Sequence, residues 1–379
     1  VMAGSIAAAG VLIAAVITGG ILATSYHHIP APNSHTHGAT HGTTHDAPQP
    51  HTAALHSLIA TLADPRGALT SGGVDSLAYS PDGQTLATGD NDGHLYLWST
   101  ATHTVTASVK EPNAGSTVNA LAFSPDGQTL AMGDDEGGTY LWSTATRTFT
   151  ATLNDPGGVG GGTAWVTFGP GGHVLASAKT DSNTVYLWNV ARQKVAARLT
   201  DPSSLGASYG VFRPGGQALA VGDLDGGTYL WNVPARGVTA TLADPGTAVG
   251  VEAVAFSADG RTLATGDTDG RACLWNMSTR SLTATLVAPV RNDGMAWVAL
   301  SPDGQTLATA YNSAPSGSST DPFVNTVYLW NTATGKLTAT LADPGSQGPA
   351  AGAFSPDGRT LAIADGNGRT YLWHIPAGG

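Results

Sequence analysis

The sequence predicts an all-β protein, a ring of seven four-stranded antiparallel blades arranged as a seven-bladed β-propeller. A Leu-Trp pair recurs seven times, in steps of 44, 46, 43, 44, 55 and 43 residues, and a period of about 40 to 45 residues is that of a propeller blade. Within each period, short segments alternate apolar and polar residues, as strands do. Glycine makes up 50 of the 379 residues and charged residues only 11%, which suits short strands joined by tight turns.

The second copy of the unit shows the four strands of a blade most clearly. It divides into VNALAFSPDG (118–127), QTLAMGDDEG (128–137), GTYLWSTAT (138–146) and RTFTATLNDP (147–156). The PDG and DEG turns contain glycine, which adopts positive φ freely, and aspartate, whose carboxylate accepts hydrogen bonds from nearby backbone N–H groups. Each copy is therefore expected to fold as a four-stranded antiparallel meander.

The first segment of the array is expected to close the ring. The last copy supplies only three strands, and residues 56–65 (HSLIATLADP) are a near copy of the fourth-strand segment 335–344 (GKLTATLADP). We therefore expect a strand at 56–65 to complete the seventh blade, so that residues 56–379 form one closed propeller. Closure removes the open sheet edges that would otherwise invite aggregation.

Residues 1–25 are predicted to be a transmembrane helix or signal anchor. Residues 3–24 contain no charge and are long enough to span a bilayer as a helix. The first Lys or Arg is Arg66, so the basic start of a secretory signal peptide is missing and the positive-inside rule does not orient the segment. We expect a single-pass membrane protein with an extracytoplasmic propeller; a secreted protein is the alternative if the segment is cleaved.

Residues 26–55 are predicted to be a flexible linker rich in histidine and proline. Eight of the twelve histidines fall between His27 and His56, and imidazole is a common ligand of Zn, Ni and Cu. The candidate metal ligands are His35, His37, His41 and His45. A plain tether is the favoured interpretation, because Asp46 is the only carboxylate in the tract and no cysteine accompanies it; no other cofactor is expected.

Two motifs identify the repeat. Six copies carry a Tyr-Leu-Trp triplet, Cys273 replaces the Tyr in the fifth, and an SPDG-type turn follows most first strands. The repeat tryptophans are Trp98, Trp142, Trp188, Trp231, Trp275, Trp330 and Trp373. The array resembles the WD-repeat family of β-propellers, in a degenerate bacterial branch, because the Asp that follows Trp in the family and the family's Gly-His pair are absent. The resemblance implies that hydroxyl groups such as those of Thr88 and Thr265 belong to a hydrogen-bonded set with the Trp.

Charge and motifs argue against nucleic-acid binding and catalysis. Sixteen Lys and Arg stand against 27 Asp and Glu, for a net charge of −11, and the basic residues form no run. Only four histidines follow the first segment of the array, each in a different blade context, and no GxSxG, HExxH or phosphate-loop motif occurs. The chain is therefore predicted not to be an enzyme, with a propeller hydrolase or lactonase as the remaining alternative.

The resemblance places the connections between blades and the turns between second and third strands on one face. Eighteen of the 27 acids map to these segments, so the face would steer a basic protein or peptide partner. The alternative is that Asp in these turns only caps backbone N–H groups. A longer insertion at 311–325 in the sixth copy lies on the same face. The candidate partner-binding residues are Asp134, Asp135, Glu136, Asp223, Asp225, Asp267, Asp269, Asp321 and Phe323.

These features together predict a non-enzymatic protein-interaction or sensory scaffold, tethered to a membrane through residues 3–24. Similar bacterial propellers form the outer part of membrane-spanning serine/threonine kinases, so the resemblance also implies a kinase domain upstream of Val1 as one arrangement. A secreted or anchored propeller that binds a ligand or metal through its His-rich tether is the alternative.

Overall fold

The computed structural model describes most of the repeat array. The described residues are 56–65, 73–113, 115–156, 161–180, 182–202, 206–245, 250–289, 293–312, 326–342, 344 and 347–376. The predicted membrane helix, the linker with its candidate metal ligands, and the candidates Asp321 and Phe323 lie outside these residues. Every regular element in the described ranges is a strand, and none of these ranges holds a helix long and apolar enough to cross a bilayer.

The strands of the first four blades follow one another in chain order. Blade 1 contains β2 (Val74–Tyr79), β3 (Thr85–Asp90), β4 (His94–Ser99) and β5 (Thr104–Lys110). Blade 2 contains β6 (Val118–Phe123), β7 (Thr129–Asp134), β8 (Thr139–Ser143) and β9 (Thr148–Leu153). Blade 3 contains β10 (Thr163–Phe168), β11 (Val174–Lys179), β12 (Thr184–Asn189) and β13 (Lys194–Thr200). Blade 4 contains β14 (Ala207–Phe212), β15 (Ala218–Asp223), β16 (Gly227–Asn232) and β17 (Gly237–Ala243).

The last three blades complete the ring. Blade 5 contains β18 (Val251–Phe256), β19 (Thr262–Asp267), β20 (Arg271–Asn276) and β21 (Ser281–Val287). Blade 6 contains β22 (Asp293–Leu300), β23 (Thr306–Asn312), β24 (Thr326–Asn331) and β25 (Lys336–Ala342). Blade 7 contains β26 (Pro349–Phe354), β27 (Thr360–Asp365), β28 (Arg369–His374) and, as its outer strand, β1 (Ser57–Ala63). The insertion predicted at 311–325 begins two residues later, because Tyr311 and Asn312 extend β23.

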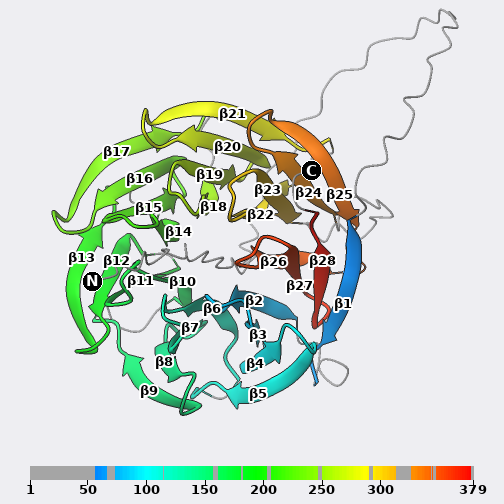
Figure 1. Cartoon of the computed structure of the whole chain (residues 1–379). Helices are drawn as coiled ribbons and strands as arrows, with labels where there is room; N and C mark the ends of the chain where they lie inside the picture. The colour runs from blue at the N-terminus through cyan, green and yellow to red at the C-terminus, as the bar shows by residue number, and fades with distance from the viewer. Residues whose placement is uncertain are drawn as a thin grey trace, which may run out of the picture.

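The predicted closure of the ring is confirmed. β1 pairs antiparallel with β28, from Ser57 opposite His374 to Ala63 opposite Arg369, and Figure 1 shows β1 completing the circle of blades next to β25 and β5. The sequence prediction of seven four-stranded antiparallel blades is likewise confirmed. Because the last blade joins both ends of the array, the seven blades form one ring.

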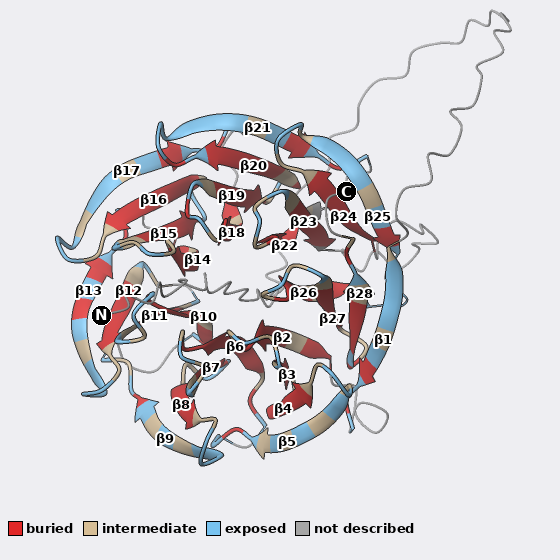
Figure 2. Cartoon of the chain, in the orientation of Figure 1, coloured by how far each residue is buried: buried red, intermediate tan, exposed pale blue. Residues whose placement is uncertain are grey.

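Burial differs sharply between the inner and outer strands of a blade. In blade 2, all six residues of the innermost strand β6 are buried, whereas the outer strand β9 alternates between exposed and half-buried residues. Figure 2 shows the same contrast around the whole ring, with exposed residues on the outer strands. Inner strands are covered on both faces by neighbouring blades and therefore read as nearly continuous apolar runs, while the outer strand meets solvent on one face.

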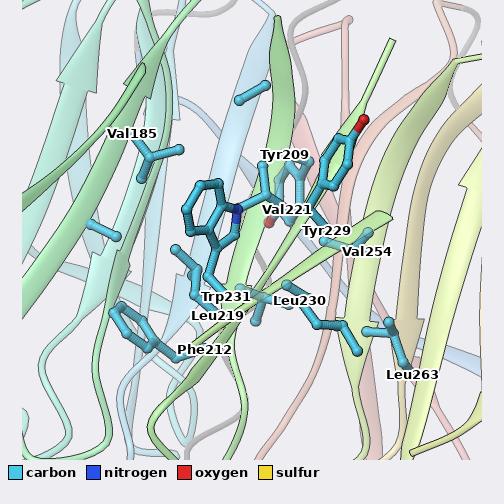
Figure 3. Packing of buried hydrophobic residues seen from close by; sticks show 14 of the residues in the cluster. Val185, Tyr209, Phe212, Leu219, Val221, Tyr229, Leu230, Trp231, Val254 and Leu263 are labelled. Atoms are coloured by element: carbon cyan, nitrogen blue, oxygen red, sulfur yellow. The ribbon is translucent and has the colours of Figure 1, made fainter. Parts of the chain in front are cut away.

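The repeat tryptophans sit in cores that neighbouring blades share. Figure 3 shows one such cluster, in which Val185 of blade 3 and Val254 of blade 5 accompany Trp231 of blade 4. In four blades the indole Nε1 donates to a second-strand hydroxyl, at 2.9–3.0 Å: Trp98 to Thr88, Trp188 to Ser177, Trp275 to Thr265 and Trp330 to Thr309. This confirms the hydroxyls predicted at Thr88 and Thr265.

The other three blades have an apolar residue at the position of that hydroxyl. Met132, Val221 and Ile363 occupy it, and the buried Nε1 atoms of Trp142, Trp231 and Trp373 have no hydrogen-bond partner. A buried donor without a partner costs stability, so these blades depend more heavily on apolar packing than the other four do.

Two extra tryptophans on first strands fill space left by glycines of the next blade. A side-chain carbon added to Gly210 would lie 2.4 Å from the Trp165 ring, and one added to Gly352 would lie 2.2 Å from the Trp297 ring. Both tryptophans are almost fully buried. Each Trp and the glycine in the following repeat therefore form a complementary pair across a blade interface.

Candidate functional site

The blade connections and the turns between second and third strands lie side by side. The backbone N–H of Asp135, in such a turn, donates to the carbonyl of Thr117, in the preceding connection, at 3.2 Å. Asn91 makes the same kind of contact with Gly73, at 3.1 Å. We call the face formed by these connections and turns the acidic face.

Fifteen described acids belong to the acidic face, and most are not exposed. They are Asp64, Asp90, Asp92, Glu111, Asp134, Asp135, Glu136, Asp155, Asp201, Asp223, Asp225, Asp244, Asp267, Asp269 and Asp365. The acid that ends the second strand is buried in blades 1, 2, 4, 5 and 7, with an exposed fraction of at most 1%. A large share of the negative charge of this face is thus located beneath its surface.

The buried acids hold the backbone of their turns. Oδ1 of Asp90 accepts hydrogen bonds from the backbone N–H groups of Asp92, at 3.0 Å, and His94, at 2.6 Å. Oδ1 of Asp267 accepts from Asp269 at 3.0 Å and from Arg271 at 2.7 Å. Each carboxylate satisfies donors that would otherwise be unpaired in a tight turn.

The predicted partner-binding residues therefore divide into two groups. Asp134, Asp223 and Asp267 are completely buried, so they support the turns and do not present their carboxylates to solvent. The second group is exposed and consists of Asp135, Glu136, Asp225 and Asp269. Within this group, Asp135 accepts a hydrogen bond from the backbone N–H of Thr117 and Asp225 accepts from the hydroxyl of Tyr229. Asp269 forms an ion pair with Arg271 at 3.1 Å. A partner docking on this face would meet the second group first.

Several buried acids face another acid across a blade interface. The pKa of Asp90 is raised to about 7, mainly by burial and in part by the hydrogen-bonded carboxyl of Asp64 from the preceding connection. Burial likewise raises the pKa of Asp267 to about 6, with a contribution from Asp244. The sequence analysis missed these pairs. Their only signal is that an acid recurs both after fourth strands and at the ends of second strands.

Blade 3 replaces the acid pair by an ion pair. Lys179 ends its second strand, and its Nζ lies 3.7 Å from Oδ2 of Asp155, which follows the fourth strand of blade 2. The guanidinium of Arg198 lies over the ring of Tyr186 in the same blade, 5.5 Å from its centroid. The interface position thus accepts either sign of charge.

Two further carboxylates lie on the innermost strands. Burial raises the pKa of both Asp75 on β2 and Glu252 on β18 to about 7; the charge of Asp135 adds to the first shift and that of Asp267 to the second. Oε2 of Glu252 is buried without a hydrogen-bond partner. In the ranges that the structure describes, no three His, Cys, Asp or Glu side chains are grouped so as to hold a metal ion.

Comparison with protein families agrees with the architecture. The family model described as WD domain, G-beta repeat, matches residues 57–99, 104–143 and 239–276. Each match begins in an outer strand and continues through the three inner strands of the next blade. No curated protein matches the chain. Three segments of the chain thus match the WD40 repeat, and they lie within a seven-bladed propeller.

Proposed function

We propose that this propeller is a non-enzymatic interaction scaffold that binds a basic protein or peptide through the exposed acids of the acidic face. One observation supports this proposal: in the turns between second and third strands, some acids are buried and hold the turn, whereas others are exposed. In blade 2, buried Asp134 accepts a hydrogen bond from the backbone N–H of Gly138 and holds the turn. Asp135 and Glu136 are exposed, and Oδ1 of Asp135 also accepts a hydrogen bond from the backbone N–H of Thr117 at 3.0 Å. Loops on a rigid scaffold are a common location for binding residues.

Charge complementarity favours a basic partner. Asp225 and Asp269 repeat the exposed position in blades 4 and 5, so the exposed acids are distributed around the face and do not form a single cluster. A face with an excess of negative charge steers a basic partner and raises its association rate, and salt screens this effect. Two of its acids are partly compensated, because Asp269 is paired with Arg271 and Asp155 with Lys179.

Binding of a fluorescent lysine-rich peptide, followed by anisotropy at low ionic strength, tests the proposal. Neutralising two exposed acids with Asp135→Asn and Glu136→Gln should weaken binding several-fold. The matched control, Gln217→Lys and Gln305→Lys, changes the net charge equally on the opposite face and should have a much smaller effect. Equal losses in both variants would show that net charge, and not the acidic face, governs binding.

We also propose that residues 3–24 anchor the propeller to a membrane with the array outside the cytoplasm, in a degenerate bacterial branch of the WD-repeat proteins that includes outer regions of serine/threonine kinases. The support is the uncharged length of this segment. The full chain should float with phosphatidylcholine vesicles in a density gradient, and a variant with two lysines in the segment, Ala14→Lys and Ala15→Lys, should not. Flotation of both variants would refute the anchor.

A second candidate function is metal binding by the tether. The eight histidines between His27 and His56 favour it. Calorimetric titration of the full chain with Zn or Ni should show binding that is lost when His35, His37, His41 and His45 are changed to alanine. Heats no larger than those of dilution would leave the tract as a plain linker.

A further inference from the structure

The face opposite the acidic face carries net positive charge. It consists of the turns between first and second strands and those between third and fourth strands, and we call it the basic face. Its nine basic residues are Arg147, Arg192, Lys194, Arg213, Arg236, Arg261, Arg280, Lys336 and Arg359. Its five acids are Asp82, Asp126, Asp259, Asp303 and Asp357. The two faces of the ring therefore carry net charges of opposite sign.

The five acids of the basic face have a structural role in their turns. In blade 2, Ser124 Oγ donates to Oδ1 of Asp126 at 2.6 Å, and this hydrogen bond holds the pKa of Asp126 below its usual range. Blades 3 and 4 lack the acid and its hydrogen bond, because Gly171 and Gly215 occupy the position of the acid. The positive charge of the basic face is therefore least compensated in these two blades.

Blades 3 and 4 carry basic side chains on the basic face close to the two turns that lack an acid. Arg192, Lys194 and Arg236 are exposed in their third-to-fourth-strand turns. Arg213 is half-buried, and its Nε donates to the carbonyl of Gly260 in the next blade at 2.8 Å. Within the turns of these two blades on the basic face, all of which the structure describes, no acid accompanies them.

Exposed apolar side chains lie along the edge of the same face. They are located at the beginning of outer strands in blades 4 to 7, with exposed fractions of 36–46%: Leu58, Ile59, Val238, Leu282 and Leu337. The corresponding residues of blades 1 to 3 are less exposed, since each of them is half-buried. Arg236, Arg280 and Lys336 come one or two residues before three of these apolar side chains, so basic and apolar residues are neighbours in the sequence at the start of these outer strands.

The chain also enters the propeller at this face. Ser57, the first residue of β1, lies opposite His374, the last residue of β28, at the end of the blade remote from the acidic turns. Any segment N-terminal to Ser57 therefore joins the ring on the basic side. Basic side chains near an anionic bilayer are attracted to it, and nearby apolar side chains strengthen such binding.

We propose that the basic face docks on the surface of an anionic phospholipid bilayer. Arg192, Lys194 and Arg236 contact lipid phosphates, and the apolar edge of blades 4 to 7 lies at the level of the head groups. The acidic face then points away from the membrane and is open to its partner. The orientation of the full chain rests on the membrane anchor proposed above, whereas the attraction of this face to anionic lipid does not.

Two single-cysteine labels on one blade can measure this orientation. Cys273 is buried, so a dye attached to Ala235→Cys, in an exposed turn of the basic face, or to Leu224→Cys, exposed on the acidic face, reports one site. The full chain is mixed with phosphatidylcholine vesicles that carry acceptor-labelled head groups, with or without phosphatidylserine. Phosphatidylserine should increase the excess of energy transfer from position 235 over that from position 224, and salt should reduce this increase.

A charge-reversal variant tests whether the basic side chains are responsible for the docking. Arg192→Glu, Lys194→Glu and Arg236→Glu in the Ala235→Cys chain should remove most of the phosphatidylserine-dependent increase in energy transfer from position 235. Lys110→Glu, an exposed site away from the basic face, is the control and should change it little. Near-ultraviolet circular dichroism verifies that each variant is folded.

The outcomes separate the two proposals. Equal transfer from both positions in phosphatidylserine vesicles, or an unchanged transfer from position 235 after charge reversal, overturns the docking of the basic face. If an acidic protein or the acidic face of a second copy is the true occupant, lipid composition will leave the transfer unchanged, which also overturns it. Failure to float with pure phosphatidylcholine refutes the anchor alone, because binding to phosphatidylserine is still measurable.

Discussion

Blade 3 and blades 1 and 5 have the same four-stranded architecture but opposite electrostatics at their interfaces. In blade 3, Lys179 lies beside Asp155, and the two charges compensate each other. In blade 1, Asp90 is hydrogen-bonded to Asp64, and in blade 5 Asp267 lies near Asp244. The repeat therefore tolerates two arrangements of charge at one position, and the contribution of the acid pair to stability depends on pH.

The direction of the pH effect follows from the raised pKa values. Asp90 and Asp267 titrate near 7 and 6 in the folded protein, well above the value of an unfolded chain. Between about pH 4 and pH 7 the folded state therefore holds protons that the unfolded state has released. The stability from these groups is fully present below about pH 4 and is lost as the pH rises through 6 to 7.

Removing the junction between blades 7 and 1 should have the largest effect. A chain that begins at Ser71 lacks β1 and Asp64, so β28 is left with an open edge and the ring cannot close. We expect loss of the cooperative thermal transition, measured by calorimetry. A shortened chain that melts like the full one would disprove the closing role of β1.

Disrupting the packing between blades 3 and 4 should have the second largest effect on stability. Gly210→Val would place a side chain against the Trp165 ring and should cost about 3 kcal/mol of unfolding free energy in urea. Trp165→Ala should cost a similar amount by leaving a cavity. The double variant recreates the Ala120–Val166 combination found between blades 2 and 3 and should be more stable than either single one; additive losses would exclude direct complementarity.

Converting the blade 3 ion pair into an acid pair should have a smaller effect. Lys179→Asp is expected to lower the unfolding free energy by about 2 kcal/mol at pH 8, with part of the loss recovered at pH 5 because one carboxyl can then take up a proton. The control is Lys110→Asp, which makes the same charge change at an exposed strand end. Equal losses at both sites would mean that net charge alone is responsible.

Neutralising one acid in blade 5 should have the smallest effect. Asp267→Asn retains an acceptor for the turn and removes a carboxyl with a raised pKa. We compare the unfolding free energy of this variant with that of the parent at both pH values. Going from pH 5 to pH 8, the difference should shift by about 1 kcal/mol in favour of the variant. Asp259→Asn serves as the control, because the pKa of Asp259 is lowered by its hydrogen bond from Ser257 and its loss should give no such gain.

Much of the fold could be predicted because repeats and strand alternation are local properties of the sequence. The likeness of residues 56–65 to 335–344 was enough to predict which strand closes the ring, and the register of β1 on β28 confirms it. The hydroxyls of Thr88 and Thr265 were likewise predictable, since both lie at one position of a repeated unit.

The candidate site was predicted less completely. The sequence indicates that Asp134 and Asp135 are neighbours in one turn, but not that the first is completely buried and the second exposed. Adjacent residues in a tight turn point in different directions, and which one faces the neighbouring blade depends on how the blades pack. The division between supporting and exposed acids therefore emerged only from the folded ring.

The sequence by itself determined the number of blades, their strand order and the closing strand, because each depends on patterns that repeat along the chain. Only the tertiary structure decided that Asp90 meets Asp64, that Lys179 meets Asp155, and that Trp165 fills the space above Gly210. The physical reason is that these partners belong to different repeats. Periodicity specifies the position of a residue within its own blade, whereas contacts across an interface depend on how two blades pack when the ring closes.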